Sequence, residues 1–203
     1  MEHAPVFERI YQEYIGKISP LDLHIIKDRL GLKLDKDGAI IPFYGIPYRV
    51  SKQGIVDANG RRPSHSVSVV LCKYLLMCPE NEPKGSDWVT YKDFKDAAPF
   101  VGGFLNTAEK PISRTLGGRM SELERLSMEL SGRPADIEIS CDLAVRFEAL
   151  PRVPLLMLFN DRDEDFPAQC SLLFERRAEH YLDMECLAMV GIILAARLTR
   201  SSN

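Results

Sequence analysis

The sequence predicts a single α+β domain in which an antiparallel sheet, a meander plus a C-terminal hairpin, packs with several helices. Some segments carry apolar residues three and four positions apart, as amphipathic helices do, whereas others are short apolar or alternating runs between turn signals. Strand-helix-strand alternation does not run through the chain, which disfavours a parallel doubly wound sheet. Of the 203 residues, 45% are hydrophobic, which is enough to build one core without disulfides or a metal.

Two helices are predicted at the start of the chain. Residues 5–17 form an amphipathic helix. Its buried stripe consists of Val6, Phe7, Ile10, Tyr14 and Ile18. A second helix follows in "SPLDLHIIKDRLG", where Ser19 can cap the helix, Pro20 suits the first helical position and Gly31 can take the left-handed conformation that stops it.

The segment "AIIPFYGIPYRVSKQGIVDANGRRP" changes period and predicts a β-meander. Short β-branched and aromatic runs are separated by turn signals at Gly45, at residues 52–54 and at residues 59–60. Ser64 then opens a helix in "HSVSVVLCKYLLMC".

The middle of the chain predicts a polar loop, a short strand or turn around Trp88, and then several helices. The helical segments run from Phe100 to Leu130, and we expect them to be interrupted at Gly102–Gly103, at Pro111 and at Gly117–Gly118.

Strands return in the last third of the chain. Alternation predicts strands in "ADIEIS" and in "LAVRFEAL", and "VPLLMLF" is apolar at every position, which indicates a strand covered on both faces. "AQCSLLFE" supplies its antiparallel hairpin partner, and residues 176–198 form a long helix. We therefore expect residues 1–203 to form one globular domain, with residues 1–80 and 135–200 as two similar subunits, each a hairpin followed by a helix.

Charge and cysteine content exclude several classes of protein. The 26 basic and 29 acidic residues give a net charge of -3, and the basic residues are scattered, so we expect no nucleic-acid partner. The N-terminus lacks a signal-peptide pattern, and the longest uncharged apolar run, "CLAMVGIILAA", is too short for a membrane span. Five cysteines without a C-x-x-C indicate free thiols in a reducing compartment, which places the protein in the cytoplasm.

The segment "NDRDEDFPAQC" is the most concentrated group of carboxylates. Asp161, Asp163 and Asp165 alternate, so an extended backbone would point them the same way, toward one cation. A calcium loop is excluded because Phe166 replaces its glycine and Leu172 its final glutamate. An irregular metal loop remains as an alternative.

Distances along the expected hairpin and helix favour a structural role for this turn. If the helix began at Arg176 and packed straight back along its strand, His180 would lie more than about 20 Å from the carboxylates. The same geometry returns Arg197 and Arg200 to their level. We therefore expect ion pairs that join Asp163 and Asp165 to Arg197 and Arg200.

Four other residues are candidates for ligand binding. Arg176 and Arg177 occupy a first helical turn, where cations are unfavourable, so they pair with Glu175 and Glu179 or face an anionic ligand.

His180 and Met184 are four residues apart, a spacing that can present a soft or haem-iron ligand pair on a helix, although packing is the simpler interpretation. Trp88 is the only tryptophan, and it completes the set of binding candidates.

Several motifs resemble the domain-of-unknown-function family numbered 3786, from anaerobic bacteria and archaea. They are "PFYGIPYRV", "VVLCKYLL", "DWVTYKDF" and above all "PRVPLLMLFNDRDEDFPAQCSLLF" with "AEHYLDMECLAMVG", and the resemblance covers roughly residues 20–198. The acidic turn running into Phe166, Pro167 and Ala168 is its most specific part, whereas Asn160 and Arg162 depart from the aromatic and glycine of relatives. The family carries no established activity. Some relatives are fused to an iron-sulfur domain, and this fusion implies a setting in anaerobic one-carbon or redox metabolism. Residues 1–203 do not contain the cysteine-rich segment of such a domain.

The leading functional hypothesis is a cytoplasmic, non-enzymatic binding or accessory protein. Its motive is a high apolar content with aromatic residues near glycine turns and no catalytic motif. The ligand would be a small anion, a tetrapyrrole-like cofactor or a partner protein, and the sequence requires no cofactor. The alternatives are a carboxylate- or metal-dependent hydrolase or transferase that uses the acidic turn, and a structural module that forms homo-oligomers.

Overall fold

The computed structural model describes residues 5–200 and arranges them around two antiparallel sheets with helices packed against both, which confirms the predicted α+β class. Residues 1–4 and 201–203, which the predicted domain included, lie outside this range. In the described part, one sheet has the strand order β1-β2-β3-β4 and the other has the order β5-β9-β8-β7-β6. No helix between residues 5 and 200 combines the length and apolar character that crossing a membrane requires.

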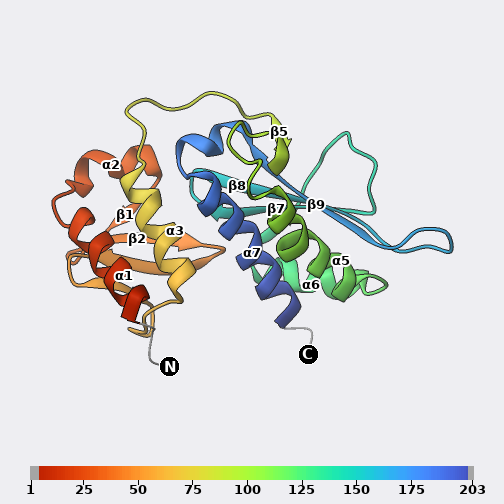
Figure 1. Ribbon diagram of the computed structural model, residues 1–203, viewed down its shortest axis with the longest axis horizontal. Helices are drawn as coiled ribbons and strands as arrows, with labels where there is room; N and C mark the ends of the chain where they lie inside the picture. Colours follow the sequence, from red (N-terminus) through yellow and green to blue (C-terminus); the bar gives the residue numbers. More distant parts are fainter. Residues whose placement is uncertain (1–4, 201–203) are drawn as a thin grey trace.

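The predicted meander forms the first sheet. Its strands are β1 (Lys33–Leu34), β2 (Ala39–Phe43), β3 (Ile46–Ser51) and β4 (Gly54–Asp57). The helices beside it are α1 (Pro5–Ile18), α2 (Leu23–Leu30) and α3 (His65–Leu76). Figure 1 shows α1 and α3 side by side against this sheet. Ser64 caps α3, as expected, by accepting the N–H of Val67.

The start of α2 differs from the sequence prediction. Asp22 caps the helix by accepting the N–H of His24 at 2.9 Å, so the prediction that Ser19 is the cap is wrong. Both residue types make good caps, and the chain turns at Ser19 and Pro20 before the helix begins. Gly31 ends α2 with a left-handed φ of 67°, as predicted.

The second sheet surrounds the predicted apolar strand. Its strands are β5 (Trp88–Thr90), β6 (Gly132–Pro134), β7 (Leu143–Leu150), β8 (Val153–Asn160) and β9 (Gln169–Glu175). β8 lies between β7 and β9 and is buried from Val153 to Met157, so it is covered on both faces as expected. The strand predicted in "ADIEIS" is wrong, because backbone pairing with β7 stops at Ala135 and leaves Ile139 49% exposed.

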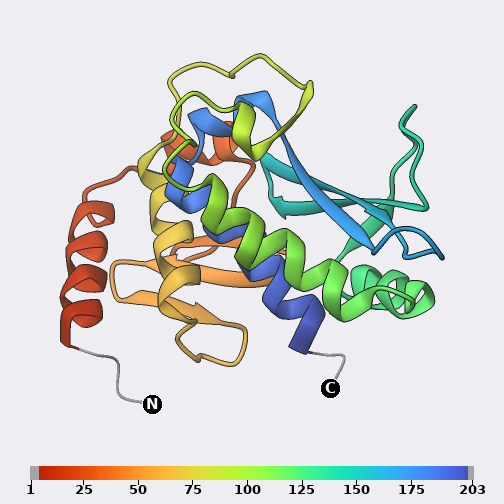
Figure 2. The same cartoon turned by 45° about the vertical axis from the view of Figure 1, so that its right-hand side comes forward.

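The middle helices are less interrupted than their glycines and proline predicted. They are α4 (Val101–Phe104), the π-helical turn η2 (Leu105–Glu109), α5 (Lys110–Leu116) and α6 (Met120–Glu129), preceded by the 3₁₀ turn η1 (Tyr91–Asp93). The first three run on continuously (Figure 2), and only Gly117–Gly118 breaks the series. Pro111 is tolerated because it directly follows the π turn, in which Lys110 donates its N–H to the carbonyl of Leu105.

The C-terminal helix begins later than predicted. Residues 176–180 form a 3₁₀ turn, η3 (Arg176–His180), and α7 (Met184–Arg200) follows. Asp183 sets this start because its carboxylate accepts the N–H of Cys186 at 2.9 Å. It also pairs with Lys73 of α3 at 2.8 Å. Both views show α7 between α3 and the continuous helix formed by α4, η2 and α5, which we call the α4–α5 rod, and α7 contacts each of these elements.

Tyr44 connects the first sheet to the second. It occupies the two-residue β2–β3 turn with Gly45, and both have positive φ, 50° and 76°, as the twist of a tight hairpin requires. A tyrosine is rare in this conformation. Here it is 1% exposed, its N–H donates to Ala149 of β7 at 3.0 Å, and its hydroxyl donates to Val190 of α7 at 2.8 Å. Tertiary contacts therefore offset the local strain.

Removal of the Tyr44 hydroxyl should weaken the whole fold. We expect Tyr44→Phe to lower the free energy of unfolding by about 1–2 kcal/mol, because a buried hydrogen bond to α7 is lost. Tyr14→Phe is the matched control, since Tyr14 is half-buried and its hydroxyl makes no hydrogen bond within residues 5–200, and it should change stability by less than about 0.5 kcal/mol. Urea denaturation measures both. Equal effects of the two substitutions would contradict this role.

The Asp183 carboxylate should make stability depend on pH. Burial raises its pKa, but hydrogen bonds from Lys73 and Cys186 outweigh burial and hold the pKa below its usual range. Its contribution is therefore present above the unfolded pKa of about 3.9 and is lost as pH falls through the lower folded pKa. We expect Asp183→Asn to be about 1 kcal/mol less stable than wild type near pH 7, since the Lys73 pair is partly exposed.

Urea denaturation between pH 7 and pH 3 tests this linkage. The stability difference between wild type and Asp183→Asn should shrink below about pH 4, because protonation of the Asp183 carboxylate in wild type then removes the charge that the variant lacks at every pH. Asp96→Asn, an exposed residue, serves as the control and should show no such trend. A difference that stays constant across the whole range would rule out the ion pair as its source.

Candidate functional site

The acidic turn is organised by hydrogen bonds from backbone N–H groups, three within the turn and one from Gly118. Asp161 accepts N–H groups from Gly118 and Arg162, and Asp163 accepts those of Asp165 and Phe166. Between residues 5 and 200, no group of three or more His, Cys, Asp or Glu side chains is placed to hold a metal ion. The structure therefore does not bring Asp161, Asp163 and Asp165 together as a ligand set.

The expected ion pairs with the end of α7 are not formed. Arg197 instead donates to the carbonyl of Phe43 at 3.2 Å and lies over the rings of Phe43 and Tyr44. No ion pair joins Arg197 or Arg200 to Asp163 or Asp165 in the described range. The prediction assumed that the helix starts at Arg176 and runs straight back along β9. The later start of α7, and its path between α3 and α5, carry its end away from the acidic turn.

The structure does bring Trp88, Arg176 and Arg177 together. Trp88 pairs with Glu175 in the β5–β9 register, and Arg177 donates to the buried carboxylate of Glu175 at 2.5 Å. Arg176 pairs with Asp87 at 2.8 Å. The predicted ion pair with Glu175 is thus confirmed for Arg177, whereas Arg176 forms its ion pair with Asp87. Carboxylates of the protein itself thus bind both guanidinium groups, which weakens the case for an anionic ligand at this place.

His180 and Met184 do not share a helix face. His180 ends η3 and is exposed, and Met184 is the first residue of α7 and is buried. The predicted i, i+4 pair is therefore wrong, because Asp183 starts a new helix between the two residues.

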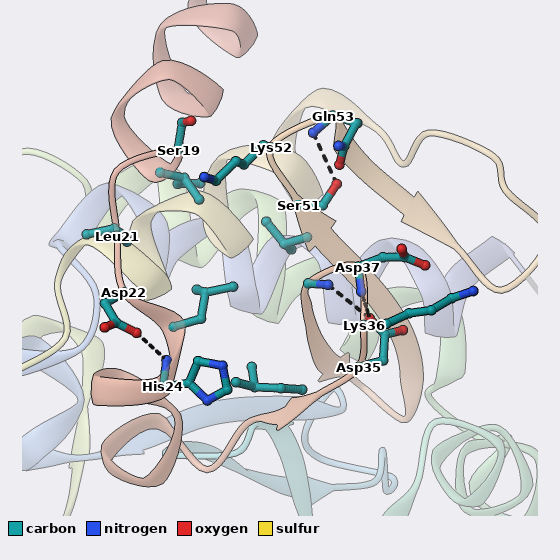
Figure 3. Close-up of a pocket in the computed structure, with 15 residues that line it drawn as sticks. Ser19, Leu21, Asp22, His24, Asp35, Lys36, Asp37, Ser51, Lys52 and Gln53 are labelled. Carbon is teal, nitrogen blue, oxygen red and sulfur yellow. Dashed lines mark hydrogen bonds between the residues drawn. The ribbon is translucent and has the colours of Figure 1, made fainter.

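A cleft of about 500 Å³ opens between the α1–α2 connection and two turns of the first sheet, the β1–β2 turn and the β3–β4 turn (Figure 3). We call it the α2 cleft. Its apolar lining comes from Ile18, Leu21, Leu23, Leu34 and Val50. Its polar lining comes from Ser19, Asp22, His24, Asp35, Lys36, Asp37, Gly38, Ser51, Lys52 and Gln53.

Two of the three carboxylates of the α2 cleft are already used by the fold. Asp22 caps α2. Asp35 accepts the N–H groups of Asp37 and Gly38 at 2.9 Å and pairs with Arg49 at 2.8 Å. The hydrogen bond from Asp37 and the contact with Arg49 hold the pKa of Asp35 below its usual range. These two acids stabilise the walls, and Asp37 is the third carboxylate, whose side chain makes no hydrogen bond or ion pair with a described residue.

The basic groups of the α2 cleft are not engaged in the same way. Among the described residues, Lys52 and His24 make no side-chain hydrogen bond or ion pair. Figure 3 shows Lys52 extending toward Ser19 on one side of the opening and the His24 ring on the opposite side, whereas Lys36 points outward. Two side chains that can bind an anion thus face each other across an apolar floor.

A second cavity of about 260 Å³ lies between β5, η1, the α4–η2 rod and β9. We call it the Glu109 pocket, after the carboxylate that ends η2. Glu109 accepts the N–H of Leu172 at 2.9 Å. Burial raises the pKa of Glu109, although the hydrogen bond from Leu172 lowers it.

The five cysteines lie outside the lining of both cavities and are all free thiols. Burial raises the pKa of Cys72 to about 12.

Sequence reasoning missed the residues of both cavities. The α2 cleft gathers short polar segments from four elements, and only the turn-forming "DKDG" at residues 35–38 pointed to one wall. Glu109 lay in a segment interpreted as ordinary helix. The signal that was present is Pro111, which cannot donate to the carbonyl of Thr107 and so disturbs the helical turn that contains Glu109.

A family model described as Domain of unknown function (DUF3786) matches residues 22–197. The match includes all residues that line the Glu109 pocket and most of those that line the α2 cleft, whereas α1 lies outside it. Comparisons with curated proteins and with solved structures found no match.

Proposed function

The chain belongs to the DUF3786 family, as its motifs indicated, and from that premise we propose that it is a non-enzymatic binding protein for a small organic acid. The acid would occupy the α2 cleft, with its apolar body on the floor and its carboxylate between Lys52 and His24. The observation that carries this proposal is the pairing of an apolar floor with basic groups that no described carboxylate engages.

The size and lining of the α2 cleft support a small molecule. A volume of about 500 Å³ lies inside the range of about 300–1,000 Å³ that is typical of ligand sites. Such sites combine apolar walls with a few polar groups that fix orientation. A floor that includes Leu34 and Val50 gives the first property, and Lys52 and His24 give the second.

The charge of the α2 cleft supports an anion over a cation. Asp22 and Asp35 are held by backbone N–H groups, and Asp35 also by Arg49, so their charge is compensated. The ammonium of Lys52 has no such partner among residues 5–200. A ligand carboxylate would supply a charge-assisted hydrogen bond, which is among the stronger polar interactions in proteins.

The other ligands and activities that the sequence allowed have less support. A tetrapyrrole-like ligand has less support because His180 and Met184, which could have formed a haem-iron ligand pair, do not share a helix face. An enzyme at the acidic turn needs free carboxylates, but Asp161 and Asp163 accept backbone N–H groups. A cytoplasmic setting is part of the proposal and is supported by the five free cysteines. A place in anaerobic one-carbon or redox metabolism is also part of it, and this rests on the resemblance to relatives that carry an iron-sulfur domain.

Calorimetric titration with 4-phenylbutyrate tests the proposal, because this probe joins an apolar body to a carboxylate. We expect it to bind at least about tenfold more tightly than the neutral 4-phenylbutanamide, since only the acid makes the charge-assisted contact. Amide chemical shifts should move at residues 51–53 and at His24. Equal binding of acid and amide, or shifts confined to other regions, would contradict the proposal.

Charge reversal at the cleft provides the matched protein test. Lys52→Glu should weaken 4-phenylbutyrate binding by about tenfold or more, because it replaces attraction by repulsion at the carboxylate. Lys84→Glu makes the same change in the exposed loop before β5 and should leave the affinity unchanged. If both variants lose affinity equally, the effect comes from net charge and the α2 cleft is not the site.

A further inference from the structure

The Glu109 pocket contains a charge that the fold does not compensate. One carboxylate oxygen of Glu109 accepts the N–H of Leu172, and no described residue donates to the other oxygen. No lysine, arginine or histidine within residues 5–200 forms an ion pair with it. A half-buried carboxylate without a cation destabilises the protein, because burial removes water and the N–H of Leu172 replaces only part of it.

The helix around Glu109 is built in an unusual way. The η2 turn contains one more residue than an α-helical turn, which rotates the following side chains by about 100° relative to a regular helix. Asn106 and Thr107 donate side-chain hydrogen bonds to the carbonyls of Gly102 and Gly103. Single π turns of this kind recur at functional sites. The η2 turn ends at Glu109, whose side chain lines the pocket.

The wall beside Glu109 is flat and apolar. The rings of Tyr91 and Phe104 stack with centroids 4.4 Å apart and planes 17° apart. The Tyr91 hydroxyl donates to Met184 of α7 at 2.7 Å, so it is directed away from a ligand. Leu105, which is 40% exposed, forms the lip of the pocket. A planar or aliphatic group could lie against this wall while a polar group reaches Glu109.

We propose that the Glu109 pocket binds a compact organic cation, an amidinium or primary ammonium on an apolar body, with the Glu109 carboxylate as its anchor. A planar amidinium can donate two parallel hydrogen bonds to one carboxylate. The pocket volume of about 260 Å³ accommodates a ligand of one ring. This site is separate from the α2 cleft and takes the opposite charge, so it goes beyond the function proposed above.

Benzamidine is the probe, with benzamide as its neutral isostere and benzoate as its anionic counterpart. Calorimetry or chemical shift titration should show that benzamidine binds at least about tenfold more tightly than either, with shifts at residues 105–109 and at Ser171. Benzamide or benzoate binding equally well would overturn the proposal. Residues 51–53 of the α2 cleft should show no shift with benzamidine, so this result is independent of the α2 cleft.

Glu109→Gln is the decisive variant because it removes the charge but keeps an oxygen that can accept the N–H of Leu172. We expect benzamidine affinity to fall by about tenfold or more. The thermal midpoint should be equal to or higher than that of wild type at neutral pH, since the raised pKa of Glu109 means that its carboxylate weakens the fold as pH rises. Unchanged affinity, or a large loss of stability that marks a purely structural role, would overturn the proposal.

A second pair of variants supplies the missing cation from the protein itself. Leu105→Arg places a guanidinium at the lip of the pocket that Glu109 also lines, where it should pair with the carboxylate, raise the thermal midpoint and abolish benzamidine binding. Leu105→Met keeps the lip apolar and should bind normally. Lys92→Gln, also at the pocket, should bind benzamidine equally or more tightly, and weaker binding would show that the pocket does not select cations.

Discussion

Two tyrosine hydroxyls from different sheets donate to backbone carbonyls of α7, and the arrangement of the molecule depends on this shared helix. Tyr44 reaches Val190 from the β2–β3 turn, and Tyr91 reaches Met184 from the segment after β5. Gly191 of α7 allows Phe104 to pack closely against the helix, because a β-carbon at this position would lie 2.5 Å from the Phe104 ring. α7 therefore makes contacts with both halves of the molecule, with α3 and Tyr44 from the first and with η2, α5 and Tyr91 from the second.

This shared helix also separates the two cavities. The α2 cleft lies at the turns of the first sheet, whereas the Glu109 pocket lies along the α4–η2 rod that packs on α7. The stacked Tyr91 and Phe104 that wall the Glu109 pocket are held from behind by α7. In the α2 cleft Asp22 and Asp35 are used for structure, whereas Lys52 and His24 make no ion pair among the described residues. In the Glu109 pocket the carboxylate of Glu109 forms no ion pair among the described residues, although Lys92 also lines the pocket. The two sites are thus opposite in charge and independent in construction.

The sequence predicts those parts of the fold whose signals are local. Apolar spacing, the Ser64 cap and the Gly31 stop locate helices, and the continuous apolar run locates β8. The predictions failed where contacts with residues distant in sequence determine whether a strand forms or where a helix begins. "ADIEIS" alternates as a strand does, but its pairing with β7 stops at Ala135. The α7 start depends on Asp183, a capping residue that was present in the sequence but was placed inside a longer helix. Neither cavity could be predicted, because each brings together segments whose proximity only the tertiary fold creates.

Native-state hydrogen exchange measures most directly whether the two sheets form one core. Amides of β3 and of β8 that exchange only through global opening should give the same free energy of opening, and Tyr44→Phe should lower both by the same amount. If the amides of β3 exchange through a lower-energy opening while those of β8 stay protected, the first sheet unfolds by itself. In that case α7 and Tyr44 do not unite the molecule.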